Sequence, residues 1–220
     1  MATAMAKHLT IEMKNLAIQA QQLKDNNGNA VDIADLVTGA VSSSSAAAVG
    51  AAATGFTAVN TVSNGLVKTV ITVPATAFVV VGGASGVGEL GKQVYDFPEG
   101  QILLLGGGAT VTITEADANI TASAVVDVSL GTAAVSGGDD ALGADATDDD
   151  LLDTGSLTMS SSTITGSIIS NTSVAKFDGT TTPIDAFLNI SVQDAGISND
   201  SATVTVSGTI TLYWMLLGDK

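Results

Sequence analysis

Residues 203–214 constrain the fold more than any other segment, because apolar and polar residues alternate there without a break. Successive side chains of a β-strand point to opposite faces, so this alternation places one set of side chains on a core. The segment is therefore predicted to be a long strand with one buried face, and Trp214 is predicted to lie in the core. The predicted inward positions are Val204, Val206, Gly208, Ile210, Leu212 and Trp214.

Shorter segments with the same apolar character recur from residue 66 to the C-terminus. Aromatic residues make up only 4% of the chain, so Val, Ile, Leu and Ala must fill the core. Pro74 and the glycines at 106–108 are expected to end strands, because neither residue type suits the interior of a β-ladder. Many short strands predict a mainly β fold, an antiparallel β-sandwich similar to a jelly roll, over residues 66–220. The expected strands are 66–73, 77–81, 102–105, 110–114, 122–130, 184–192 and 203–214.

The N-terminal segment, residues 1–39, has a helical rather than a β period, and it is predicted to form a helical arm. Such an arm either packs on its own domain, docks on a partner or forms a three-chain bundle. Residues 40–65 follow as a stretch rich in Ser and Ala, whose small side chains bury little area, and they are predicted to be a linker or an extended arm. The apolar face of the predicted helix consists of Leu9, Met13, Leu16, Ala20 and Leu23.

The charge balance excludes several classes of function. The chain of 220 residues has a net charge of −15, seven lysines, no arginine and no cysteine. Phosphate affinity comes from cationic contacts, so neither nucleic acid nor an anionic membrane surface is an expected partner. Disulfides and thiolate metal sites are excluded. No apolar run is long enough to span a membrane. The lack of a signal-peptide pattern predicts assembly in a cytoplasm.

Catalytic and cofactor motifs give no support for an enzyme. The single histidine, His8, lies in the predicted arm, so a Ser-His-Asp triad is not expected. The glycine spacing of residues 86–93 fits part of a nucleotide-binding loop, but such a loop needs a following helix, and Pro98 and Gly100 come too soon. Residues 86–93 are therefore expected to be a flexible loop between strands, and no cofactor or catalytic residue is assigned.

Seven aspartates between residues 136 and 155 predict an acidic surface loop. Calcium prefers several carboxylate and carbonyl oxygens, so this loop is a possible calcium site. The spacing does not match an EF-hand, and a calcium β-roll repeat works only when several copies stack. A solvated acidic loop is the preferred interpretation, and no metal ligands are assigned.

Three segments of the β-region resemble structural proteins of tailed bacteriophages. They are residues 95–105, residues 177–190 and residues 208–219, which contain Tyr-Asp-Phe-Pro-Glu-Gly, Phe-Asp-Gly-Thr-Thr and Gly-Thr-Ile-Thr-Leu-Tyr-Trp-Met-Leu-Leu-Gly-Asp. The resemblance extends over residues 66–220, and capsid decoration (cement) proteins of short-tailed phages are the favoured members. It implies a homotrimer that binds the major capsid protein on the outside of the head. The resemblance implies no catalytic residue.

These observations together predict a structural virion protein on the capsid surface, where it stabilises the head against the pressure of packaged DNA. Leu9, Met13, Leu16 and Leu23 are the predicted partner-binding residues, and the sheet edges are the predicted trimer contacts. A tail or fibre component is a second possibility, although no internal repeat is present. A host-surface glycan-binding module is a third, and it would require an exposed groove of aromatic side chains.

Overall fold

A computed structural model of the chain describes residues 49–63, 65–115, 117–121, 123–137, 142–143, 147–159, 163–168 and 174–218. Residues 1–48 lie outside the described part. The predicted helical arm and its residues Leu9, Met13, Leu16 and Leu23 therefore also lie outside it, as does the first part of the predicted linker.

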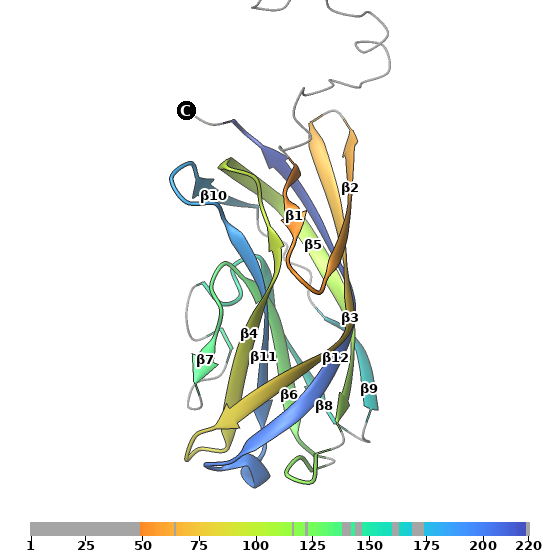
Figure 1. Cartoon of the computed structure of the whole chain (residues 1–220), viewed down its shortest axis with the longest axis vertical. Helices are drawn as coiled ribbons and strands as arrows, with labels where there is room; N and C mark the ends of the chain where they lie inside the picture. Colours follow the sequence, from red (N-terminus) through yellow and green to blue (C-terminus); the bar gives the residue numbers. More distant parts are fainter. Residues whose placement is uncertain are drawn as a thin grey trace, which may run out of the picture. The chain divides into compact units, whose positions relative to one another are not determined.

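The described chain is mainly β, as predicted, and its strands pair antiparallel. Most strands belong to one path of hydrogen-bonded neighbours in the order β10-β5-β12-β3-β4-β11-β6-β8 (Figure 1). The elements are β1 (Ala51–Ala52), β2 (Thr57–Ser63), β3 (Leu66–Gly82), β4 (Val87–Asp96), β5 (Gly100–Glu115), β6 (Val125–Gly131), β7 (Ser136–Gly137), β8 (Leu152–Thr158), β9 (Thr163–Ile168), β10 (Ala175–Gly179), β11 (Asp185–Gln193), the short 3-10 helix η2 (Ala195–Ile197) and β12 (Ser201–Leu216).

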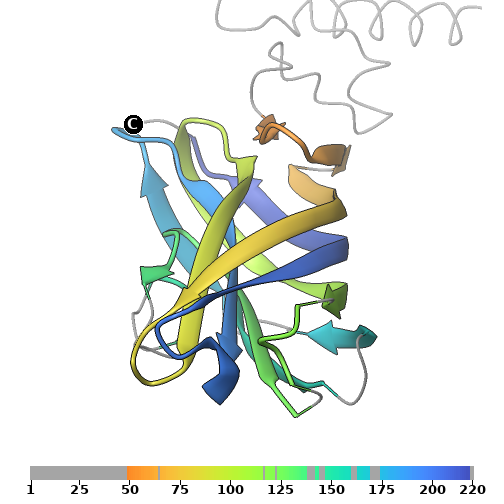
Figure 2. The same cartoon turned by 60° about the horizontal axis from the view of Figure 1, so that its bottom comes forward.

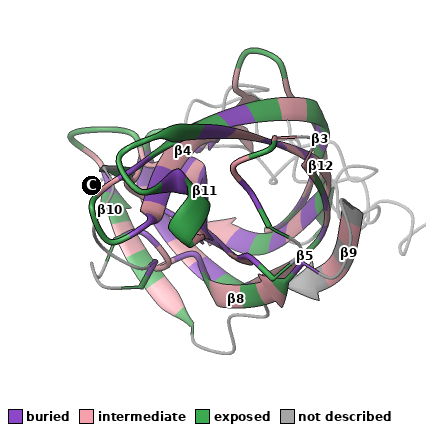
Figure 3. Ribbon diagram, turned by 90° about the horizontal axis from the view of Figure 1, so that it is seen from below, coloured by how far each residue is buried: buried purple, intermediate pink, exposed green. Residues whose placement is uncertain are grey.

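The sheet curls until its two ends approach each other. β9 pairs with β5 near one end of the strand order, β8 pairs with β6 at the other end, and β8 and β9 contact each other. Seen along the molecule, the strands surround a common interior (Figure 3), and the oblique view shows β3, β4 and β12 crossing over it (Figure 2). One continuous ladder therefore provides both faces of the sandwich that the alternating pattern predicts.

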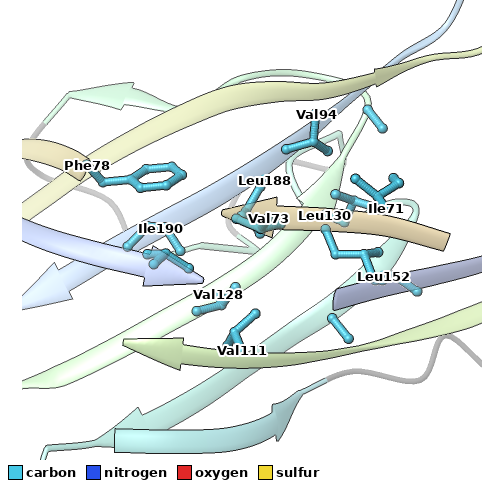
Figure 4. Packing of buried hydrophobic residues seen from close by; sticks show 14 of the residues in the cluster. Ile71, Val73, Phe78, Val94, Val111, Val128, Leu130, Leu152, Leu188 and Ile190 are labelled. Carbon is cyan, nitrogen blue, oxygen red and sulfur yellow. The ribbon is translucent and has the colours of Figure 1, made fainter. Parts of the chain in front are cut away.

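The core lies inside the curl and consists of aliphatic side chains from opposite parts of the sheet. Figure 4 shows side chains of β3, β5, β6 and β11 pointing toward one another. Five of the six inward positions predicted on β12 are confirmed, since Val204, Val206, Ile210, Leu212 and Trp214 are fully buried, whereas Gly208 beside the bulge is only partly buried. Burying an aliphatic side chain of this size contributes about 1.5–3 kcal/mol, so this face of β12 is a large part of the core.

Pro74 does not end a strand, contrary to the prediction. β3 continues through it, because Pro74 and Ala75 together lie opposite the single residue Ser207 of β12. This arrangement is a β-bulge, in which the missing amide hydrogen of proline costs no ladder bond. On the other side of β3, the pairing with β2 has already ended at Thr72.

The glycines at 106–108 do not end a strand either, and the two strands predicted on each side of them are one strand, β5. Leu105 is the extra residue of a second bulge, between the pairs Gly106–Tyr213 and Leu104–Trp214. Gly107 is required for packing here, because a Cβ atom at this position would lie 2.5 Å from the Thr211 carbonyl oxygen. Gly107 therefore allows β12 and β5 to approach closely at this point of the ladder.

Two further expectations are corrected. The predicted linker at 40–65 contains two strands, since β1 pairs with β4 and β2 pairs with β3. The expected flexible loop at 86–93 is mostly part of β4, which pairs with β11. Low sequence complexity and frequent glycine do not predict disorder in these segments, because both are ordered by ladder hydrogen bonds: β2 forms a hairpin with β3, and β1 and β4 pair with strands farther along the chain.

A buried polar network joins β2 to the core. The Trp214 indole N–H donates to the Thr69 hydroxyl (2.8 Å), and that hydroxyl donates to Asn60 Oδ1 (2.7 Å). The Tyr95 hydroxyl lies 3.1 Å from the same Asn60 oxygen and also contacts the Val49 carbonyl oxygen. Burial raises the pKa of Tyr95, so its hydroxyl keeps its proton at neutral pH. The aromatic rings stack edge to face from Tyr95 through Phe97 to Trp214.

We expect Thr69→Val to lower the free energy of unfolding by about 1–3 kcal/mol, because it leaves the buried Trp214 N–H and Asn60 oxygen without this partner. Thr72→Val is the matched control on the exposed face of the same strand, and it is expected to change stability by less than about 0.5 kcal/mol. Urea denaturation followed by tryptophan fluorescence measures both. Equal effects of the two substitutions would contradict the role of this network.

Asp194 joins the loop before β6 to η2. Its carboxylate accepts hydrogen bonds from the Thr121 amide (2.8 Å), the Thr121 hydroxyl (2.6 Å) and the Gly196 amide (2.7 Å). Burial alone would raise the pKa of Asp194, but these bonds outweigh it and hold the pKa below its ordinary value.

A lowered pKa stabilises the fold where the carboxylate is ionised, so Asp194 contributes stability above the ordinary aspartate pKa of about 3.9. This contribution is lost as the pH falls through the lower pKa of the folded state. We expect the stability difference between wild type and Asp194→Asn to be constant above about pH 5 and to shrink below pH 4. Urea denaturation at several pH values measures this difference in the free energy of unfolding. A difference that grows in acid would contradict the lowered pKa of Asp194.

Candidate functional site

The three phage-like segments of the sequence come together at one end of the curled sheet. Gly100 pairs with Gly179 of β10, and Ile102 pairs with Leu216 of β12. Asp96 of β4 pairs with Asp185 of β11. Backbone bonds continue past the end of β12, where Gln101 N donates to the Gly218 carbonyl (3.1 Å). Segments that are distant in sequence thus form one local structure, near the top of Figure 1.

The turn from β4 to β5 anchors this end of the sheet. Phe97 is buried against Trp214, and its amide donates to the Ile184 carbonyl (2.9 Å). In the turn at the end of β10, the Asp178 carboxylate accepts from the Thr180 hydroxyl (2.6 Å) and the Thr180 amide (3.2 Å). The Thr180 hydroxyl is the main reason that the pKa of Asp178 is lowered. The motifs that carry the resemblance therefore act here as turn and packing elements.

Apolar side chains gather on the outer face of the same end. Leu66, Met215 and Leu103 are direct cross-strand neighbours on β3, β12 and β5, and all three are partly exposed. None of them belongs to the group that packs against the core. Four further side chains are 39–63% exposed. We call the whole set the apolar patch: Leu66, Leu103, Leu105, Val174, Tyr213, Met215 and Leu217.

Lysines flank the apolar patch. Lys176 pairs with Leu103 across the β10–β5 ladder, and Lys68 pairs with Tyr213 across the β3–β12 ladder. The described part of the chain contains one other lysine, Lys92. β10 also lies at the end of the strand order, and no described strand pairs with its outer edge. This region combines exposed apolar surface, positive charge and a sheet edge, which is the chemistry of a protein-binding surface.

The predicted acidic loop is folded against the outer face of the sheet. Asn189 of β11 holds it through both atoms of its amide, with Nδ2 donating to the carbonyls of Ala133 (3.0 Å) and Asp148 (2.8 Å). Asn189 Oδ1 accepts from the Val135 amide (3.2 Å). Ser129 of β6 donates to the Asp148 carbonyl as well (2.7 Å). Gly91 makes room for this arrangement, since a Cβ atom there would lie 2.3 Å from Asn189 Oδ1.

Three of the four described aspartates of this loop accept hydrogen bonds within the protein, and the fourth, Asp153, is exposed. Asp148 is only 4% exposed, contrary to the expectation of a surface loop, and its carboxylate accepts from the Gly143 amide. The Asp150 carboxylate accepts from the amide and hydroxyl of Thr132, each at 2.7 Å, while burial raises its pKa. Asp149 accepts from the Thr154 hydroxyl. Residues 139, 140 and 145 lie outside the described part, so the calcium hypothesis for the loop as a whole stays a prediction.

Other sequence hypotheses can be placed on the structure. Residues 86–93 contain no helix start, so the geometry of a phosphate-binding loop is absent from this described segment. Tyr95 and Trp214 are fully buried and cannot line a glycan groove, whereas Tyr213 is 40% exposed. Within the described ranges, no helix has the length and hydrophobicity to cross a membrane.

Comparisons with known proteins identify no relative: no family model matches the chain, and no curated protein matches it.

We expect Asn189→Asp to destabilise the fold by about 1–3 kcal/mol, because it replaces a buried donor with an oxygen that faces two carbonyl groups. The matched control is Asn199→Asp, which adds the same charge at an exposed position in a turn. Hydrogen exchange should show faster exchange at residues 132–135 and 147–151 in the first variant alone. Unchanged exchange there would mean that Asn189 does not hold the loop.

Proposed function

We propose that this chain is a structural virion protein of a tailed phage, and that it decorates and cements the outside of the capsid. The observation that carries the proposal is the convergence of the three phage-like segments into one end of the sheet, beside the apolar patch. The motifs act as turn and packing elements, and their pairing places the partly exposed Leu103 and Met215 beside each other. Their meeting supports a shared role in assembly.

The proposed mechanism is mechanical. Packaged DNA pushes the shell outward, and a protein bound across the junctions of major capsid subunits raises the free energy needed to separate them. A β-sheet that is curled around an aliphatic core suits this role, because most of its hydrogen bonds are internal and do not depend on the partner. Several weak contacts made by one trimer would also add their binding energies through avidity.

The apolar patch and the edge of β10 are the proposed trimer contacts. Exposed Leu105, Val174 and Leu217 give this surface the apolar character of an interface core. Lys68 and Lys176 would offset some of the repulsion between chains that each carry a net charge of −15. Leu9, Met13, Leu16 and Leu23 stay the proposed residues for binding the major capsid protein.

A tail or fibre component is the second candidate, because a trimer built on the same patch would serve there equally well. The burial of Tyr95, Phe97 and Trp214 weakens the glycan-binding alternative. Sugars stack on exposed aromatic faces, and the described part of the chain offers Tyr213 as its most exposed ring.

We expect light scattering on a sizing column to give a mass of about three chains of 21.8 kDa. Leu217→Glu introduces a charge into the patch, and it should reduce the mass to that of one chain while the near-native circular dichroism spectrum is retained. Thr209→Glu, on the exposed face of the same strand but outside the patch, should remain trimeric. A monomeric wild type, or a trimeric Leu217→Glu variant, would contradict the proposed contacts.

The location on the virion needs a separate experiment. Immunogold labelling of intact virions distinguishes a head protein from a tail protein. Co-sedimentation of the purified protein with heads that lack it then tests cementing, and bound protein should delay the release of DNA on heating. Labelling confined to the tail, or bound protein without a delay, would contradict the decoration role.

A further inference from the structure

A second row of polar side chains crosses the outer face of the sheet beside Asn189. Ser191 of β11 pairs with Glu89 of β4 on one side and with Asp127 of β6 on the other. Direct partners in an antiparallel ladder project to the same face, with Cβ atoms about 4.5–5.5 Å apart. Two carboxylates therefore flank one hydroxyl group on adjacent strands.

This row is buried, although it lies on the outer face. Asp127 is 5% exposed, Ser191 is fully buried, and Glu89 is 9% exposed. In the neighbouring row, Asn189 and Ser129 bind the backbone of the acidic loop. The two rows therefore differ in how their polar groups are satisfied.

Two atoms of the buried row have no hydrogen-bond partner in the described structure: Asp127 Oδ1 and Ser191 Oγ. The other oxygen of Asp127 accepts from the Gln193 amide at 2.5 Å, which fixes the carboxylate in place. A buried carboxylate oxygen without a partner is costly, and native structures rarely keep one. The position therefore lacks a group that carries positive charge or donates hydrogen bonds.

Protein cations do not fill this position. Lys68 and Lys176 lie on β3 and β10, and the amine of Lys92 donates to the Ala77 carbonyl (2.6 Å) above the Phe78 ring. These are the lysines of the described part of the chain. The described lysines therefore leave this position open to a cation or a water molecule from solution.

We propose that Asp127, Ser191 and Glu89 bind a divalent cation of the calcium type on the outer face of β4, β11 and β6. Calcium takes carboxylate, hydroxyl and water oxygens at 2.3–2.6 Å in flexible geometry. Asp127 Oδ1 and Ser191 Oγ supply two of these oxygens, Glu89 lies within side-chain reach on the next strand, and water completes the shell. No group of three Asp, Glu or His residues in the described ranges could hold a metal, so the hydroxyl is an essential part of this site.

The test is titration calorimetry of the full-length protein with CaCl₂, after treatment with EDTA and dialysis. One bound Ca²⁺ per chain is expected at this site, together with a rise of the thermal midpoint that equal ionic strength of NaCl does not give. Asp127→Asn should weaken this binding at least tenfold. Asp153→Asn, an exposed aspartate at the start of β8, is the matched control and should bind like wild type.

Ser191→Ala is the second variant, because it removes one ligand oxygen without adding volume and keeps the proposal testable if Asp127→Asn does not fold. It should bind Ca²⁺ more weakly than wild type and lose most of the thermal shift. Absence of binding to the wild type would overturn the proposal and leave water as the partner of these atoms. Binding that both variants retain would place the ion elsewhere on the chain and would equally overturn the proposal.

Discussion

The structure depends on the burial of one face of β12. This strand pairs with β3 on one side and with β5 on the other over most of its length, so both long ladders are held in register by it. Its inward side chains cover the core from Val204 to Trp214. A shift of one residue would turn all of them to solvent, and this makes the register of the three strands strongly specified.

The long alternating strands could be predicted from the sequence, because each one encodes its own buried face. The strand breaks could not, and Pro74 and the glycines at 106–108 show why. Both are local signals whose effect depends on what lies opposite: at Pro74 and beside Gly106 the opposite strand is one residue short, so a bulge absorbs the irregularity. β1 and β2 were missed for a related reason, since their order comes from pairing with β4 and β3 and not from their own composition.

The candidate sites were less accessible to sequence analysis than the fold. On β11 the odd-numbered residues Asn189, Ser191 and Gln193 look like an ordinary solvent-facing set. Asn189 is buried because the acidic loop returns to cover it, through contacts such as that to Asp148, which is 41 residues away in the chain. For a polar residue on the face opposite an apolar stripe, the sequence does not indicate whether water or a loop covers its side chain. The weak signals available were two acids and a serine, each on a different strand.

The electrostatic environments of the two proposed sites, the apolar patch and the polar row around Asp127, differ. Around the apolar patch the charges are exposed, and salt screens repulsion between chains beyond about 8 Å at physiological ionic strength. An apolar contact flanked by Lys68 and Lys176 can therefore outweigh a large net negative charge. Asp127 is buried, where salt screening is weak, and the proposed cation would supply a counter-charge in direct contact with its carboxylate. The patch lies on β3, β5 and β12 and on residues next to the ends of β10 and β12, whereas the polar row lies on β4, β6 and β11, so substitutions in the two sites should act independently.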